Sequence, residues 1–307
     1  MNRTFWKNFN LGIELDIAGN FIYNGLKYFD EMESLYYDDD IFTFLYQIAV
    51  GIERLEKISL ILIENKEDIE NEKQLKFEES LKSHNHIELL RRIKKYHKLT
   101  FNKEHNKFIQ ILTNFYKDSR YGRYSLANLN NYDEEKNILV TFINKYSTEN
   151  IDNTFGTPVR QNNTSIKNFI GEVVQKIVLS LYQVIETESK NQNILTHEIR
   201  FDSKASKIFL QKKFDFNNEK ILIKELMIFM LKNNSGFIKY LKSIEALDFD
   251  ETMLPYYFKC FNNDVVKLKY IDELNSQYES VKNAKERFQY LDILDFENID
   301  FDDIDKD

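Results

Sequence analysis

Apolar positions along this chain recur at the spacing of amphipathic helices. Residues 41–64, IFTFLYQIAVGIERLEKISLILIE, form the clearest helical segment, and residues 10–33 and 103–117 carry weaker stripes of the same period. Only two prolines and eight glycines occur among the 307 residues, so few positions interrupt a helix. These patterns predict an all-α fold in which residues 1–128 form a bundle of four or more helices.

Polar residues dominate segment 129–165, which is rich in Asn and Asp and is predicted to be a linker between two domains. Helical patterns then cover residues 166–291, and either Thr164 or Ser165 is expected to cap the first of these helices. Residues 197–214 are ambiguous and could form a short β-hairpin. We therefore predict a second, C-terminal helical domain over 166–291.

Charge is unevenly distributed around a formal net value of −8. Residues 292–307 form an acidic tail with eight carboxylates and one lysine, whereas residues 82–107 carry eight Lys or Arg side chains against Glu88 and Glu104. The basic run is a candidate surface for RNA. Because the tail also holds six large apolar side chains, we expect it to dock, either on the basic run or on a cognate protein partner.

The composition also bears on compartment and cofactors. The single cysteine excludes a disulfide framework and favours a cytoplasmic protein. Four charged residues lie in the middle of segment 41–64, so we predict no membrane span and no membrane partner. Four histidines cluster in the sequence, but they lack the carboxylate or thiolate ligands at fixed spacing that a metal site requires. We expect no metal and no cofactor.

The segment SHNHIELLRRIKKYH, residues 83–97, combines a helix start with basic side chains. Asn85 followed by Glu88 is a capping box, which predicts a helix that begins at residue 86. Its basic residues fit either a solvated helix face or contacts with RNA; they are Arg91, Arg92, Lys94 and Lys95. Glu53 and Lys57, one turn apart in segment 41–64, fit either an internal ion pair or part of a polar site.

A second segment, FYKDSRYGRYSL, alternates aromatic and basic residues. Arginines pair bidentately with phosphate and tyrosines stack on bases, so the mixture suits RNA. Alternatively, Arg120 and Tyr121 close the bundle by packing and by hydrogen-bonding helix ends. The RNA-binding candidates of the chain are Lys94, Lys95, Arg120, Tyr121, Arg123 and Tyr124.

Three pieces of residues 35–128 together resemble the HEPN superfamily of nucleotide- and RNA-associated four-helix domains. LYQIAVGIERLEKISLILIE is similar to the second helix of the family, SHNHIELL to the start of the next helix, and FYKDSRYGRYSL to the end of the last helix. The resemblance implies an all-α fold that is often dimeric. For many members it implies metal-independent RNA cleavage in toxin, abortive-infection or antiphage systems.

Active members of this family carry an Arg-x(4–6)-His motif. Its histidine acts as general acid or base on the ribose 2′-OH, and its arginine stabilises charge at the phosphate. By this resemblance the catalytic candidates are Arg91, Arg92 and His97, with His84, Asn85 and Glu53 in supporting positions.

The sequence is thus interpreted as a homodimeric, RNA-directed effector, a metal-independent endoribonuclease of a bacterial defence or toxin system. The alternative is a non-catalytic HEPN-like module that binds RNA, a nucleotide or a partner protein.

Overall fold

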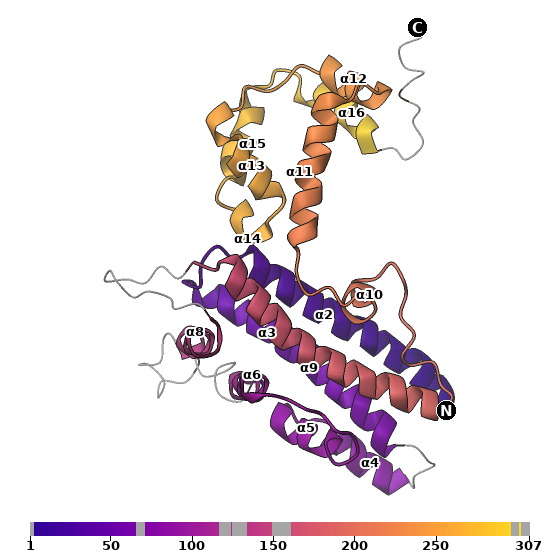
Figure 1. Cartoon of the computed structure of the whole chain (residues 1–307). Helices are drawn as coiled ribbons and strands as arrows, with labels where there is room; N and C mark the ends of the chain where they lie inside the picture. Colours follow the sequence, from indigo (N-terminus) through magenta and orange to yellow (C-terminus); the bar gives the residue numbers. More distant parts are fainter. Residues whose placement is uncertain are drawn as a thin grey trace. The chain divides into compact units, whose positions relative to one another are not determined.

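The computed structural model describes residues 3–65, 71–116, 124, 134–148, 161–295 and 301 (Figure 1). Regular structure in these residues is helical, apart from one isolated antiparallel bridge between Ser34 and Gln161. The predicted all-α fold is confirmed. The chain divides into two compact units, Met1–Asp215 and Phe216–Asp307.

The first unit is built around three long helices, which Figure 1 shows side by side. They are α2 (Leu11–Glu31), α3 (Asp38–Glu64) and α9 (Thr164–Asn191). Short helices precede and surround them: α1 (Arg3–Phe5), the π-helix η1 (Trp6–Asn10), α4 (Asn71–Ser80), α5 (His86–Ile93), α6 (Lys103–Asn114), α8 (Glu134–Tyr146) and α10 (Lys204–Phe209).

Helix α3 forms the centre of this unit. It contacts α2, α9, α5, α6 and α8, so apolar side chains are required around most of its circumference. Its fully buried side chains include Ile41, Phe44, Ile48, Ile52 and Leu55. The predicted helix at 41–64 is confirmed, with three additional residues at its start.

Side-chain caps fix where two of these helices begin. Asn85 accepts a hydrogen bond from the backbone N–H of Glu88 at 3.3 Å, which confirms the predicted start of α5. Helix α9 is capped by Asn163, which accepts from the backbone N–H of Ile166 at 3.0 Å. The prediction of Thr164 or Ser165 as this cap was wrong, since both residues already lie inside the helix.

The division between units lies at residue 215 rather than in segment 129–165. Asn162 donates to the backbone carbonyls of Phe29 at 2.6 Å and Met32 at 3.2 Å, and α9 then packs on α3. The segment predicted as linker also contains α8, whose buried apolar residues are Leu139, Val140, Phe142 and Ile143. Residues 129–133 and 149–160 lie outside the described residues.

No hairpin forms at residues 197–214, all of which the structure describes. Ser203 caps α10 by accepting from the backbone N–H of Ser206 at 3.0 Å. The helix then buries Ile208 and Phe209, and the Phe209 ring stacks on Tyr182 at 4.9 Å between centroids. Burial against α2 and α9 therefore favours a helix over the predicted strands.

A close approach between α2 and α10 predicts a matched pair of stability effects. A methyl group at Gly19 would lie 2.5 Å from Cα and Cβ of Ala205, whereas Gly12 has nothing within 4 Å. Gly19→Ala should lower the free energy of unfolding of this unit by about 1–3 kcal/mol through overpacking. Gly12→Ala should raise it by about 0.5–1 kcal/mol. Urea unfolding followed through Trp6, the one tryptophan of the chain, would measure both.

The second unit consists of shorter helices. They are α11 (Asn217–Lys232), α12 (Gly236–Ser243), α13 (Leu254–Phe261), α14 (Asp264–Lys267), α15 (Ile271–Ser276) and α16 (Ala284–Asp292), with 3-10 turns at Glu251–Met253, Gln277–Ser280 and Ile293–Asp295. A small core is formed by Tyr257, Cys260 and Leu274. Among all described residues, no helix is both long and apolar enough to cross a membrane.

One aromatic residue of the acidic tail packs inside the second unit. The Phe301 ring lies 5.2 Å from that of Phe237 and 5.5 Å from that of Tyr240, both on α12. This contact gives the tail an apolar attachment in its own unit. The rest of the tail beyond Asp295 lies outside the described residues.

Candidate functional site

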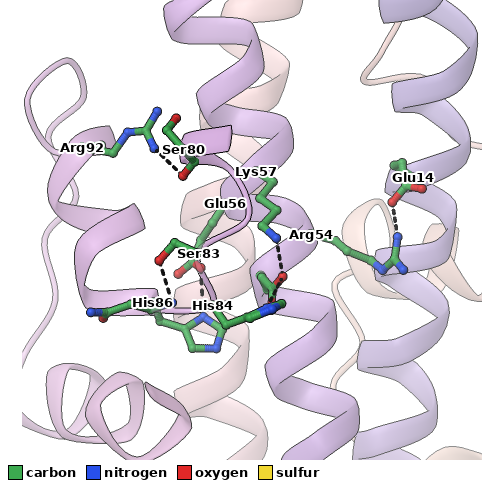
Figure 2. Close-up of polar contacts among 11 residues, drawn as sticks. Glu14, Arg54, Glu56, Lys57, Ser80, Ser83, His84, His86 and Arg92 are labelled. Carbon is green, nitrogen blue, oxygen red and sulfur yellow. Dashed lines mark hydrogen bonds and ion pairs between the residues drawn. The ribbon is translucent and has the colours of Figure 1, made fainter. Parts of the chain in front are cut away.

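Four polar side chains on α3, two on each side of the buried Leu55, carry the chemistry of the first unit. Glu53 and Lys57 are four residues apart and share one face of the helix, whereas Arg54 and Glu56 leave it in other directions. Figure 2 shows Arg54 reaching toward Glu14 and Lys57 reaching to the other side of α3, toward His84. Each of these side chains has a partner from another element or from its own turn.

The outer part of the site is a carboxylate–histidine pair. Nδ1 of His84 lies 3.0 and 3.1 Å from the two carboxylate oxygens of Glu53, and Nζ of Lys57 donates to the same carboxylate at 2.6 Å. The His84 side chain is 53% exposed, and its ring stacks on Tyr116 at 5.0 Å with an interplanar angle of 6°. The imidazole is therefore oriented from two sides while one edge remains accessible.

Glu53 is held in its charged form. Burial alone would raise the pKa of its carboxyl, but the positive charge of Lys57 and the hydrogen bonds from Lys57 and His84 outweigh burial and lower that pKa. An ionised Glu53 favours a proton on the Nδ1 atom of His84. The other ring nitrogen, Nε2, makes no hydrogen bond within the described part of the chain.

A second carboxylate–histidine pair lies in the interior of the unit. Nδ1 of His86 is 2.9 Å from Oε2 of Glu56, and both side chains have zero exposure. Burial raises the pKa of Glu56, and the neighbouring His86 opposes that rise. The Tyr116 ring also contacts this pair, edge-on to His86 at 6.1 Å. Tyr116 therefore touches both the exposed and the buried histidine.

A cavity of about 710 Å³ adjoins the outer pair. Residues of η1, α2 and α3, of the segment before α5 and of the segment after α6 line it, and they include Glu53, Lys57, His84 and Tyr116. At another part of its wall Arg54 forms an ion pair with Glu14, and its guanidinium lies 5.7 Å from the Phe21 ring centroid. The volume is in the usual range for small-molecule and cofactor sites.

The catalytic pair expected from the sequence is held elsewhere. Arg92 donates to Glu64 at 3.2 and 2.6 Å and to the carbonyl of Ser80 at 3.3 Å. Nε2 of His97 lies 2.9 Å from Oε1 of Glu188 on α9. Each side chain thus binds a different carboxylate, and neither lines the cavity. The contacts attach α5 and the turn after it to α3 and α9.

The expected RNA-binding residues are only partly described. Arg91, Lys94 and Lys95 are exposed, and Nζ of Lys94 lies 5.1 Å from the Phe101 ring centroid. Tyr124 is 87% exposed, whereas Arg120, Tyr121 and Arg123 lie outside the described residues. The sequence interpretation passed over Tyr96, an exposed aromatic side chain beside Lys95 that a base could stack on.

The supporting residues expected from the sequence do come together. His84 and Glu53 are in direct contact, and Asn85 between the two histidines serves as a helix cap. No group of three or more His, Cys, Asp or Glu that could hold a metal ion occurs among the described residues. Family models, curated proteins and solved structures were compared with the chain, and none matches it.

Proposed function

We propose that this chain is an RNA-directed effector, a metal-independent endoribonuclease of HEPN-like type, and that His84 is its acid–base residue. The observation that carries the proposal is the half-exposed His84 ring at the edge of the cavity, with Nδ1 on the Glu53 carboxylate. A histidine oriented by a carboxylate through one nitrogen can exchange protons through the other.

The proposed reaction is transesterification at a ribose. Nε2 of His84 takes the proton of the 2′-OH, the 2′ oxygen forms a bond to phosphorus, and the bond from phosphorus to O5′ breaks. The leaving O5′ takes a proton from solvent, so the products are a 2′,3′-cyclic phosphate and a 5′-OH. The Lys57 ammonium, beside Glu53 in the same wall, would offset the charge that develops on the phosphate oxygens.

Exposed basic residues support contact with the rest of an RNA strand. Arg91, Lys94 and Lys95 lie on α5 and the turn after it, in the element that follows directly on His84. Tyr96 adds an aromatic side chain that is 62% exposed. Phosphate contacts of this kind make binding fall with rising salt, without regard to sequence.

The test is incubation of the full chain with total RNA in EDTA, followed by mapping of the new ends. We expect cleavage to persist in EDTA and to leave 2′,3′-cyclic phosphates. Cleavage that stops in EDTA, or ends that carry 5′-phosphates, would contradict the proposed chemistry.

The carboxylate contacts of Arg92 and His97 favour a second candidate function, a non-catalytic module that binds RNA or a nucleotide. In that case the two residues of the family's motif serve only to hold α5 in place. Salt-dependent RNA binding without any cleavage would support this candidate.

A further inference from the structure

The wall of the cavity that includes Glu14 and Arg54 has a different chemistry from the wall at His84. Glu53 and Arg54 are neighbours in sequence, yet Glu53 binds Lys57 and His84. Arg54 instead binds Glu14 on α2 (Figure 2). Trp6 and Phe21 also line the cavity, and the guanidinium of Arg54 lies over the Phe21 ring. This part of the wall combines aromatic surface with a carboxylate and a guanidinium.

The ion pair with Arg54 orients the Glu14 carboxylate but leaves it able to accept further hydrogen bonds. One of its oxygens, Oε2, accepts from Nη1 of Arg54, and the side chain remains 41% exposed. A carboxylate has about four lone-pair sites on its two oxygens, so it can accept further hydrogen bonds. Its natural complement is a flat group with two adjacent N–H donors.

We propose that this part of the cavity binds a guanine base, while the ribose and phosphate attached to that base lie at His84. Guanine presents N1–H and the N2 amino group side by side, which matches a carboxylate. Adenine presents an acceptor at N1 beside its amino group, and that acceptor would face the negative charge of Glu14. The aromatic lining suits the face of any base, so Glu14 supplies the discrimination.

This inference rests on the proposed function for the position of the scissile phosphate. It adds a base preference, namely cleavage on the 3′ side of guanosine. The cavity volume of about 710 Å³ is large enough for a nucleotide. Arg54 acts as a positioning residue, since it holds the carboxylate through the ion pair.

The test is calorimetric titration of the full chain in EDTA with the 3′-monophosphates of guanosine, inosine and adenosine. Inosine keeps N1–H but lacks the N2 amino group, so it should bind about tenfold more weakly than guanosine, the effect of one hydrogen bond to a charged group. Adenosine should bind more weakly still. Equal affinity for the three nucleotides would overturn the inference without any variant.

Glu14→Gln should weaken the binding of guanosine 3′-monophosphate by about tenfold or more. The affinity for adenosine 3′-monophosphate should remain nearly unchanged. Glu186→Gln is the matched control. Glu186 is also ion-paired, with Lys190 on α9, its side chain is 39% exposed, and it does not line the cavity. A guanosine affinity that is unchanged in Glu14→Gln would remove Glu14 from recognition.

The two proposals fail separately. Cleavage in EDTA after all four bases, with no nucleotide preference, would leave the nuclease standing and overturn the guanine site. Selective binding of the guanosine nucleotide without RNA cleavage would uphold the site and overturn the nuclease.

Discussion

Replacing His86 by alanine should lower the free energy of unfolding of the first unit by about 3–5 kcal/mol near neutral pH, because it leaves a buried carboxylate without its partner. Glu56 has zero exposure, and its one hydrogen bond among the described residues is to Nδ1 of His86. Urea unfolding followed through Trp6 fluorescence reports on this unit, since the tryptophan lies in η1.

The size of this loss should depend on pH. Burial raises the pKa of Glu56 above its ordinary value of 4.5, so the folded protein holds this proton to higher pH than the unfolded chain does. The corresponding stability is present at low pH and is lost as pH rises through the raised pKa. His86 lowers the pKa of Glu56, so in the His86→Ala variant the pKa of Glu56 should be raised further. His86→Ala should therefore cost less at about pH 5 than at about pH 7.

Glu56→Gln is the matched control for the buried pair. A glutamine has nearly the same volume and can still accept a hydrogen bond from His86 through its side-chain oxygen, but it does not titrate. Its unfolding free energy should lack the decline with rising pH that Glu56 produces. An equal loss for His86→Ala at both pH values would show that packing, and not charge, explains the effect.

Replacing His84 by alanine should lower the rate of RNA cleavage by about 10²–10⁴-fold, the usual contribution of a general acid or base. The side chain is half exposed, so the variant should keep its fold, which the Trp6 unfolding curve would verify. The rate is best measured as single-turnover cleavage of a short labelled RNA in EDTA. A rate within a few-fold of the unmodified chain would exclude His84 from the chemistry.

His97→Ala and Arg92→Ala distinguish His84, the catalytic residue proposed from the structure, from the Arg92–His97 pair expected from the sequence. Both side chains contact carboxylates on other helices, outside the cavity lining. We expect these variants to keep the cleavage rate and to lose stability. If His97→Ala lost cleavage and His84→Ala kept it, the catalytic residues would be Arg92 and His97, as the family motif indicates.

The helical fold could be predicted because its cause is local. Apolar residues at helical spacing identified α3, and the Asn85–Glu88 spacing located the start of α5 to the residue. The unit boundary could not be predicted in this way. The Asn- and Asp-rich composition of 129–165 suggested a linker, but whether α9 packs on α3 depends on contacts between distant parts of the chain.

The sequence identified several residues of the candidate site, but it did not predict which of them contact one another. Glu53 and His84 were recognised as candidates, but only the fold brings His84 to Glu53 across 31 residues of sequence. The Arg92–His97 spacing matched a motif, yet spacing alone cannot reveal that Glu64 and Glu188 already bind these side chains. The pairing of Arg54 with Glu14 had no local signal, since these residues are 40 positions apart.

The attachment of α9 to the first helices also governs how the chain folds while it is made. Phe29 is synthesised 133 residues before Asn162, its hydrogen-bond partner, and Lys7 is synthesised 185 residues before Gln192. At a synthesis rate of about 5–20 residues per second, the face of α3 that α9 covers remains exposed for roughly ten seconds before α9 is synthesised. Nascent α2 and α3 should therefore depend on chaperones until translation has passed α9, and a ribosome stalled before it would present an aggregation-prone apolar surface.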